Sequence, residues 1–209
     1  MNERLEVHPT HPQPRALARA AQALERHGLL LLPTDAGYAF GWALDAQQAE
    51  QRVLRLRALD TRHPFTVLCR HLSDVGSLAR LDTPAFRLVK SLVPGPYTFV
   101  LPVASALPHR LKQAPGSRSR RRAIGCRIPD HVVAQALLEA HGAPLLVSTV
   151  ALPDDSPEAH DAEAVAERLL SHVDVMLDAG DCPPGPSSVI DLTGDAPRLL
   201  RAGRIVPDL

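Results

Sequence analysis

Residues 29–42 read LLLLPTDAGYAFGW, and this stretch indicates the class of the fold. Four leucines followed by Pro33 make a short apolar run, which is typical of a buried strand. The chain then passes into Thr34, Asp35 and Tyr38 with two glycines, so hydroxyl and carboxylate groups directly follow a strand end. Open α/β sheets usually bind ligands at such strand ends. We therefore expect this segment to border a binding site.

Helical and strand patterns alternate on both sides of this segment. Helices are predicted at 15–27, 46–59, 72–80, 83–92, 130–139 and 162–170. Strands are predicted at 29–32, 64–70, 97–103, 123–128, 145–150, 173–177, 189–192 and 198–201. The short turn between the last two strands permits antiparallel pairing. We therefore expect a single α/β domain over residues 1–209 with a twisted mixed sheet. The prolines of residues 1–14 favour an extended N-terminal arm or an edge strand over a helix.

The composition excludes several classes of protein. The chain has 209 residues, 45% of them hydrophobic, and 23 basic residues balance 23 acidic ones. These totals exclude a uniformly basic nucleic-acid-binding protein. Three dispersed cysteines argue against a disulfide scaffold, so we expect a cytoplasmic protein. The longest apolar runs are too short to span a bilayer, so no membrane association is expected. The sequence carries no signal for an oligomeric state.

The distribution of charge is uneven despite the balanced total. Residues 83–129 contain no Asp or Glu but nine basic residues, and four arginines are clustered at Arg118, Arg120, Arg121 and Arg122. Guanidinium groups without neighbouring carboxylates keep their donors free for a phosphate, a nucleotide or an RNA backbone. Chance clustering in a solvated loop explains the same pattern equally well.

The common motifs of nucleotide and metal sites are absent from the sequence. There is no GxGxxG, GxxxxGK[ST], GxSxG or HExxH. His63, Cys69 and His71 lie close together, but nothing supplies a fourth ligand, so we expect no metal site and a core position for Cys69. A nucleotide site would have to be built in another way.

Residues 33–41 closely resemble P-T-[DE]-T-x-Y-G-L-G, the signature of the YrdC/YciO family. Further blocks resemble family motifs in the same order: 56–67 (K-x-R-P-x-x-N-P-L), 94–99 (P-G-P-x-T), 124–129 (G-x-R-x-P), 187–191 (S-T-V-x-D) and 200–203 (R-x-G). The resemblance extends from about Leu29 to Gly203. It implies a YrdC-like α/β fold with a large concave cavity.

Members of this family include L-threonylcarbamoyladenylate synthases, which use ATP, threonine and bicarbonate, with Mg²⁺ accompanying the nucleotide, in tRNA t6A modification. The resemblance implies no tightly bound cofactor. It implies catalytic roles for Arg57 and Thr34. Substrate-binding roles are implied for Tyr38, Thr98, Ser148, Ser187 and Arg201. Catalysis would consist of positioning and charge neutralisation, without a covalent nucleophile.

The sequence also departs from the synthase pattern. Arg57 takes the place of the family's Lys, while Leu59, His63 and Leu68 replace its Arg, Asn and His. The usual S-x-A-N reads Ser148-Thr149-Val150-Ala151, without the Asn. These differences resemble the YciO branch and predict a weakened synthase.

Two alternatives therefore stay open. One is binding of tRNA or double-stranded RNA by Arg118, Arg120, Arg121 and Arg122 without synthase activity. The other is a hydrolytic or reverse reaction on a threonylcarbamoyl compound in the same pocket.

Overall fold

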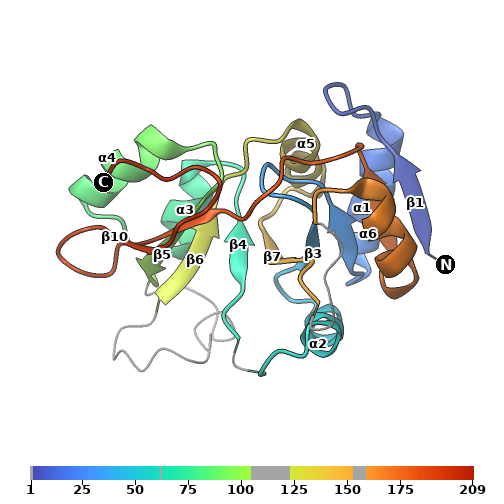
Figure 1. Cartoon of the computed structure of the whole chain (residues 1–209), viewed down its shortest axis with the longest axis horizontal. Coiled ribbons are helices and arrows are strands. Elements are labelled where there is room, and N and C mark those ends of the chain that lie inside the picture. The colour runs from blue at the N-terminus through green and yellow to red at the C-terminus, as the bar shows by residue number, and fades with distance from the viewer. Residues whose placement is uncertain (1, 62, 105–122, 153–158) are drawn as a thin grey trace.

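Ten strands form one mixed sheet in the computed structural model, which describes residues 2–61, 63–104, 123–152 and 159–209. The strands are β1 (Glu3–Glu6), β2 (Leu30–Leu32), β3 (Ala39–Ala43), β4 (Thr66–Leu68), β5 (Tyr97–Pro102), β6 (Ala123–Arg127), β7 (Leu145–Thr149), β8 (Val175–Asp178), β9 (Ser188–Asp191) and β10 (Arg198–Arg201). Their order across the sheet is β1-β8-β2-β3-β7-β4-β6-β5-β9-β10. The expected twisted mixed α/β sheet is therefore confirmed (Figure 1).

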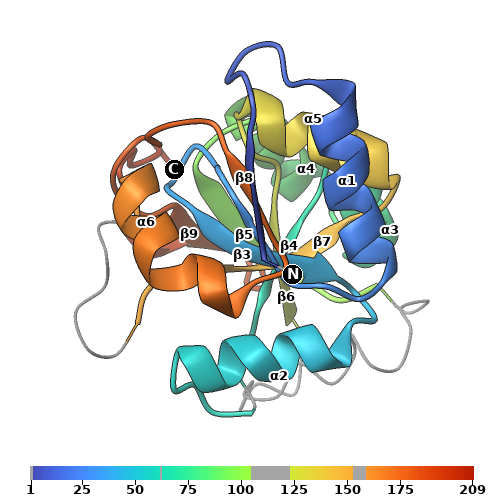
Figure 2. The same ribbon diagram turned by 90° about the vertical axis from the view of Figure 1, so that its right-hand side faces the viewer.

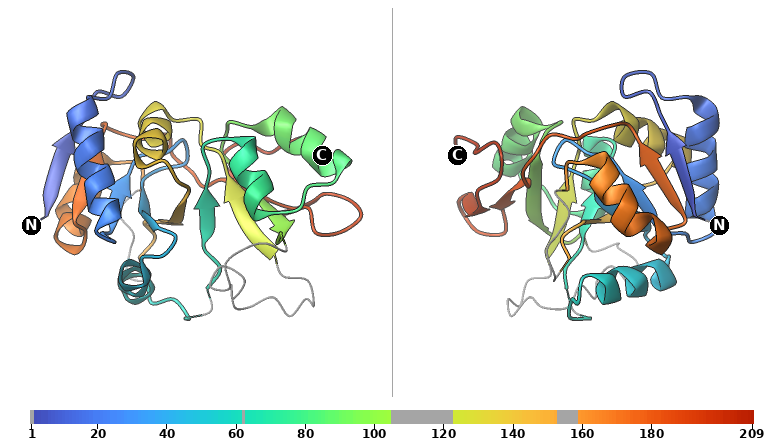
Figure 3. Two further views of the ribbon diagram at one scale, coloured as in Figure 1. Left: turned by 180° about the vertical axis from the view of Figure 1, so that it is seen from behind. Right: turned by 45° about the vertical axis from the view of Figure 1, so that its right-hand side comes forward.

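Six α-helices connect the strands of the described chain. They are α1 (Pro14–Glu25), α2 (Gln47–Leu56), α3 (Leu72–Leu78), α4 (Thr83–Leu92), α5 (Val132–His141) and α6 (Ala162–Leu169), and a short 3-10 helix, η2 (Leu170–His172), follows α6. Helices α3 and α4 lie in the half of the molecule that holds the C-terminus, and α1 lies in the half that holds the N-terminus (Figure 3). No helix of the described residues is long and apolar enough to cross a membrane.

The N-terminal segment forms an edge strand, which is one of the two structures expected for residues 1–14. Glu3–Glu6 pairs in parallel with β8 and closes one edge of the sheet. Helix α1 already begins at Pro14, because proline lacks the N–H that the first helical turn leaves unpaired and its ring fixes a helical φ.

Two apolar clusters cover the two faces of the sheet. Leu30 and Leu32 pack in the cluster that α1 and α5 cover, while Leu31 packs in the larger cluster with residues of α2 and α6. Figure 2 shows α1 and α5 side by side, across the sheet from α2. Strands buried on both faces read as continuous apolar runs, which explains the run of four leucines.

Candidate functional site

A cavity of about 570 Å³ opens over the middle of the sheet. Its floor crosses five neighbouring strands through Val147, Thr66, Gly125, Val100 and Asp191, which follow one another in the pairing register. Four inter-strand steps of roughly 4.8 Å make this floor about 19 Å long. The cavity is therefore long enough to separate two binding ends.

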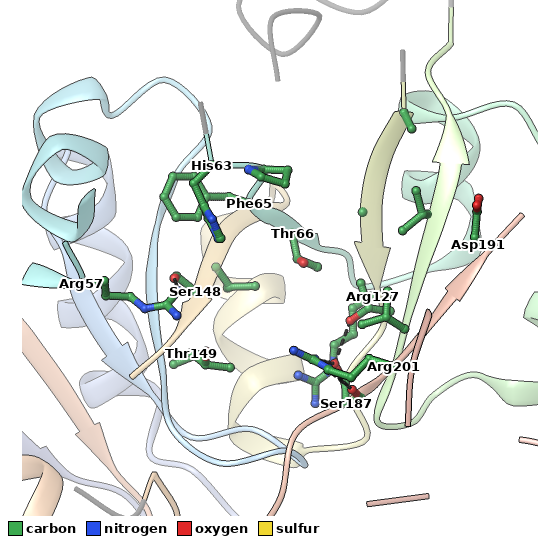
Figure 4. Close-up of a pocket in the computed structure, with 18 of the residues that line it drawn as sticks. Arg57, His63, Phe65, Thr66, Arg127, Ser148, Thr149, Ser187, Asp191 and Arg201 are labelled. Carbon is green, nitrogen blue, oxygen red and sulfur yellow. Dashed lines mark hydrogen bonds between the residues drawn. The ribbon is translucent and has the colours of Figure 1, made fainter. Parts of the chain in front are cut away.

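Arg57 defines one end of the cavity. It directly follows α2, its Nη1 donates to Ser148 Oγ at 2.5 Å, and its Nε donates to the carbonyl of Ala151 at 2.9 Å. These bonds hold the guanidinium beside the end of β7 (Figure 4). Burial lowers the pKa of Arg57 from its ordinary value, but an arginine stays charged at neutral pH.

Aromatic side chains form the adjacent wall. The ring of His63 packs edge-on against Phe65 with centroids 5.2 Å apart, and Phe65 packs in the same way on Trp42 at 4.9 Å. Burial, with a smaller effect from Arg57, lowers the pKa of His63, so its imidazole is neutral at pH 7. This wall therefore presents flat rings next to the cationic Arg57.

Hydroxyl groups and a second arginine form the other end. Thr98 Oγ1 and Ser187 Oγ lie 2.9 Å apart, and both residues are buried. Arg201 Nη2 donates to the carbonyl of Ser187 at 2.9 Å (Figure 4). Gly203 makes this approach possible, because a Cβ there would lie 2.3 Å from Pro186 O and from Ser188 N.

Arg127 lies on the cavity floor and is the main residue that the sequence prediction missed. Its Nη2 donates to Asp35 Oδ1, and both side chains are only 7% exposed. Burial lowers the pKa of Arg127, Asp35 raises it, and Arg201 lowers it again. A signal was present, since Arg127 is the only charged residue of β6 and the Arg of the G-x-R-x-P block.

Five of the seven predicted catalytic and substrate-binding residues line the cavity. They are Arg57, Thr98, Ser148, Ser187 and Arg201. Thr34 and Tyr38 do not line it. Thr34 Oγ1 donates to the carbonyl of Gly37 at 2.6 Å within a turn, and the fully buried Tyr38 donates to the carbonyl of Gly180 at 2.9 Å. Both hydroxyls are therefore used inside the protein.

The predicted RNA-binding residues Arg118, Arg120, Arg121 and Arg122 lie outside the described residues. Of the positions at which the block 56–67 departs from the synthase pattern, Arg57 and His63 line the cavity and Leu59 does not. Leu68 is fully buried in the cluster beneath α5 and does not line the cavity. Cys69 is a core residue, as expected.

No group of three or more metal-binding side chains occurs among the described residues. Among the described residues that line the cavity, Asp191 is the one with a carboxylate. This donor set fits a Mg²⁺ ion that is held mainly by the phosphates of a bound nucleotide, the usual arrangement for this cation. A Mg²⁺ ion that accompanies ATP, as the resemblance implies, would therefore enter the cavity together with the nucleotide.

The fold and the cavity define an α/β protein with a polar, arginine-lined cavity over its mixed sheet. A family model, Sua5_yciO_yrdC, described as "Telomere recombination", matches residues 22–203. The chain therefore belongs to the Sua5/YciO/YrdC family.

Relatives with known structures or names support this membership. YciO of Escherichia coli K12, described as uncharacterized, is 38% identical over 97% of this chain and 96% of its own length. The crystal structure of E. coli YciO superimposes with a TM-score of 0.88 and covers 98% of this chain and 97% of that one. P. abyssi Sua5 complexed with L-threonine is 26% identical with a TM-score of 0.82, over 96% of this chain and 57% of that one.

The threonylcarbamoyl-AMP synthase of Bacillus subtilis 168 is 28% identical over 92% of this chain and 54% of its own length. The higher identity to E. coli YciO agrees with the expected likeness to the YciO branch.

Proposed function

We propose that this protein is an enzyme of the threonylcarbamoyl-AMP synthase type. It condenses L-threonine, bicarbonate and Mg-ATP into threonylcarbamoyl-adenylate, pyrophosphate and water, and the adenylate serves tRNA threonylcarbamoyladenosine synthesis. The observation that carries this proposal is the convergence of Arg57, Ser148, Thr98, Ser187 and Arg201 on one cavity, although they come from distant parts of the chain. Relatives named as such synthases, and a Sua5 structure with L-threonine, add support.

In this proposal the side chains act by positioning and by neutralising charge. Arg57 contacts the nucleotide phosphates or bicarbonate, and Ser148 contacts the nucleotide or threonine from the same end. Thr98 and Ser187 present their paired hydroxyls to the nucleotide or threonine at the other end, with Arg201 on the nucleotide. The floor of about 19 Å leaves room for both substrates along one line.

The loss of one cation predicts weaker ATP binding than in a synthase with the full motif. Leu59 stands at the position of the motif's Arg, two residues after Arg57, and does not itself line the cavity. A hydrogen bond to a charged group contributes about 1.5–3 kcal/mol, so ATP should bind at least about tenfold more weakly.

The test is to incubate the purified chain with Mg-ATP, bicarbonate and labelled threonine, and to measure pyrophosphate and the labelled adenylate. Arg57→Gln should lower kcat/KM by about tenfold to hundredfold, because it removes a charge-assisted contact. The matched control is Arg55→Gln, an exposed arginine in the last turn of α2, which should stay within about twofold of wild type. Absence of both products, or equal rates for the two variants, would reject the proposal.

A reverse or hydrolytic reaction is the second candidate. Leu59 favours this candidate, because the missing positive charge weakens the binding of a triphosphate more than the binding of an adenylate, which carries less charge. Threonylcarbamoyl-adenylate should then be consumed by the chain, giving ATP when pyrophosphate is added or AMP when it is not. Stability of the adenylate in both mixtures would reject this candidate.

A further inference from the structure

The carboxylate of Asp35 contacts Arg127 from outside the cavity. Arg127 lines the floor of the cavity from β6, whereas Asp35 belongs to the turn after β2 and does not line it. The two side chains are joined by the Nη2 to Oδ1 hydrogen bond across 92 positions of the chain. Asp35 therefore reaches a ligand only through Arg127.

The turn at residues 34–37 holds Asp35 in this position. Thr34 Oγ1 donates to Gly37 O at 2.6 Å and accepts from Ala36 N at 3.1 Å. Gly37 has a φ of +84°, and a Cβ there would lie 2.9 Å from the carbonyl oxygen of Ala159. Arg204 Nη1 adds a bond to the backbone oxygen of Asp35 at 3.1 Å. These contacts fix the conformation of the turn, and the turn in turn fixes the position of Asp35.

The pair is incompletely satisfied within the described part of the chain. Arg127 Nε and Asp35 Oδ2 are both buried and have no hydrogen-bond partner among the described residues. An unpaired buried donor on a charged group is costly, so an acceptor from a ligand on the cavity floor would be stabilising there. Asp35 cancels the charge of Arg127, and together with the nearby Arg201 the three groups carry one net positive charge.

We propose that Asp35 is a positioning residue that holds Arg127 on the cavity floor and masks its charge. The end of the cavity that holds Arg127 and Arg201 then accepts a ligand group with one negative charge, such as the carboxylate of an amino acid, and disfavours a polyphosphate, so the phosphates of the nucleotide lie at the Arg57 end. The inference rests on the proposed function, because it names which end of the cavity rejects the phosphates. Within the signature turn of residues 33–38, Asp35 is thus the side chain that acts on the cavity, through Arg127, while Thr34 shapes the turn.

The test uses calorimetric titration of the purified chain with inorganic pyrophosphate. Asp35→Asn keeps the size and an acceptor for Arg127 but removes the masking charge, so pyrophosphate should bind on the order of tenfold more tightly. A side chain with only a structural role would not produce a gain. The double variant Asp35→Asn/Arg127→Gln should lose this gain.

The control is Asp174→Asn, which removes a carboxylate from a half-exposed ion pair with Arg52 away from the cavity. Its pyrophosphate affinity should equal that of wild type, and equal affinities for wild type and Asp35→Asn would overturn the proposal.

A second comparison covers the case in which Asp35→Asn does not fold. The double variant buries no unpaired charge, so it can be compared with Arg57→Gln when the single variant does not fold. Removing the masked pair should weaken pyrophosphate binding by less than about twofold, whereas Arg57→Gln, at the end that takes the phosphates, should weaken it by about tenfold. Equal losses would overturn the masking role.

These titrations need neither ATP nor turnover. If the chain makes no adenylate but Asp35→Asn binds pyrophosphate more tightly, the proposed function is rejected and the positioning role of Asp35 is supported. If the chain makes the adenylate but Asp35→Asn binds pyrophosphate no more tightly, only the positioning role is rejected.

Discussion

At the scale of single residues, the hydroxyl group of Tyr38 makes hydrogen bonds within the protein core and does not line the cavity. Its hydroxyl is fully buried, donates to Gly180 O at 2.9 Å and lies 3.4 Å from Asp178 Oδ1. Burial raises the pKa of Tyr38, so the hydroxyl stays protonated and remains a donor. Tyr38→Phe removes the bond that the hydroxyl donates to Gly180 O and the longer one, 3.4 Å, that it accepts from Ala179 N, and should lower the free energy of unfolding by about 1–2 kcal/mol. Urea unfolding measures this loss, and titration with L-threonine should give the wild-type affinity. Weaker binding of L-threonine by Tyr38→Phe, with unchanged stability, would show instead that Tyr38 contacts the ligand.

At the scale of elements, the segment after β10 is packed so closely that only glycine fits at one position. Gly203 N donates to Ser188 Oγ at 2.9 Å, and a Cβ at Gly203 would meet the backbone of residues 186–188. Gly203→Ala should therefore separate β10 from the Ser187 segment and lower the free energy of unfolding by about 1–3 kcal/mol. Gly76→Ala is the matched control, since nothing lies within 4 Å of its added Cβ in α3. That variant should gain about 0.5–1 kcal/mol in the same urea experiment. A Gly203→Ala chain as stable as wild type would contradict this packing argument.

At the scale of the whole molecule, positive charge is concentrated in the acid-free segment 83–129 although the net charge is zero. If the cluster at Arg118, Arg120, Arg121 and Arg122 binds RNA, changing all four to Ser should weaken retention of double-stranded RNA equally for every sequence. The slope of log K against log salt should fall by about 0.9 for each RNA phosphate that the variant no longer neutralises. Changing the exposed Arg15 and Arg26 of the α1 region to Ser should leave the slope unchanged. An unchanged slope in the fourfold variant would remove the RNA hypothesis.

The composition of the site could be predicted only in part. Thr98, Ser148 and Ser187 lie within motif blocks, so the resemblance pointed to them, and all three line the cavity. Thr34 and Tyr38 stand in the most recognisable block, yet they do not line the cavity, because a hydroxyl near a strand end can equally bond its own turn or the core. Arg127 was missed although it is the Arg of the G-x-R-x-P block, because the sequence around it does not show that Asp35, 92 positions away, is the carboxylate that it pairs with.

The alternation of strands and helices was determined by the sequence itself, since apolar periodicity and the turn residues act over short stretches of chain. The tertiary structure alone decided which side chains meet. Arg57 and Ser148 are 91 positions apart, Thr98 and Ser187 are 89 apart, and Asp35 and Arg127 are 92 apart. Such contacts depend on the order and register of the strands, which the packing of both sheet faces selects over the whole molecule. The local periodicity of apolar residues does not specify the order of the strands in the sheet.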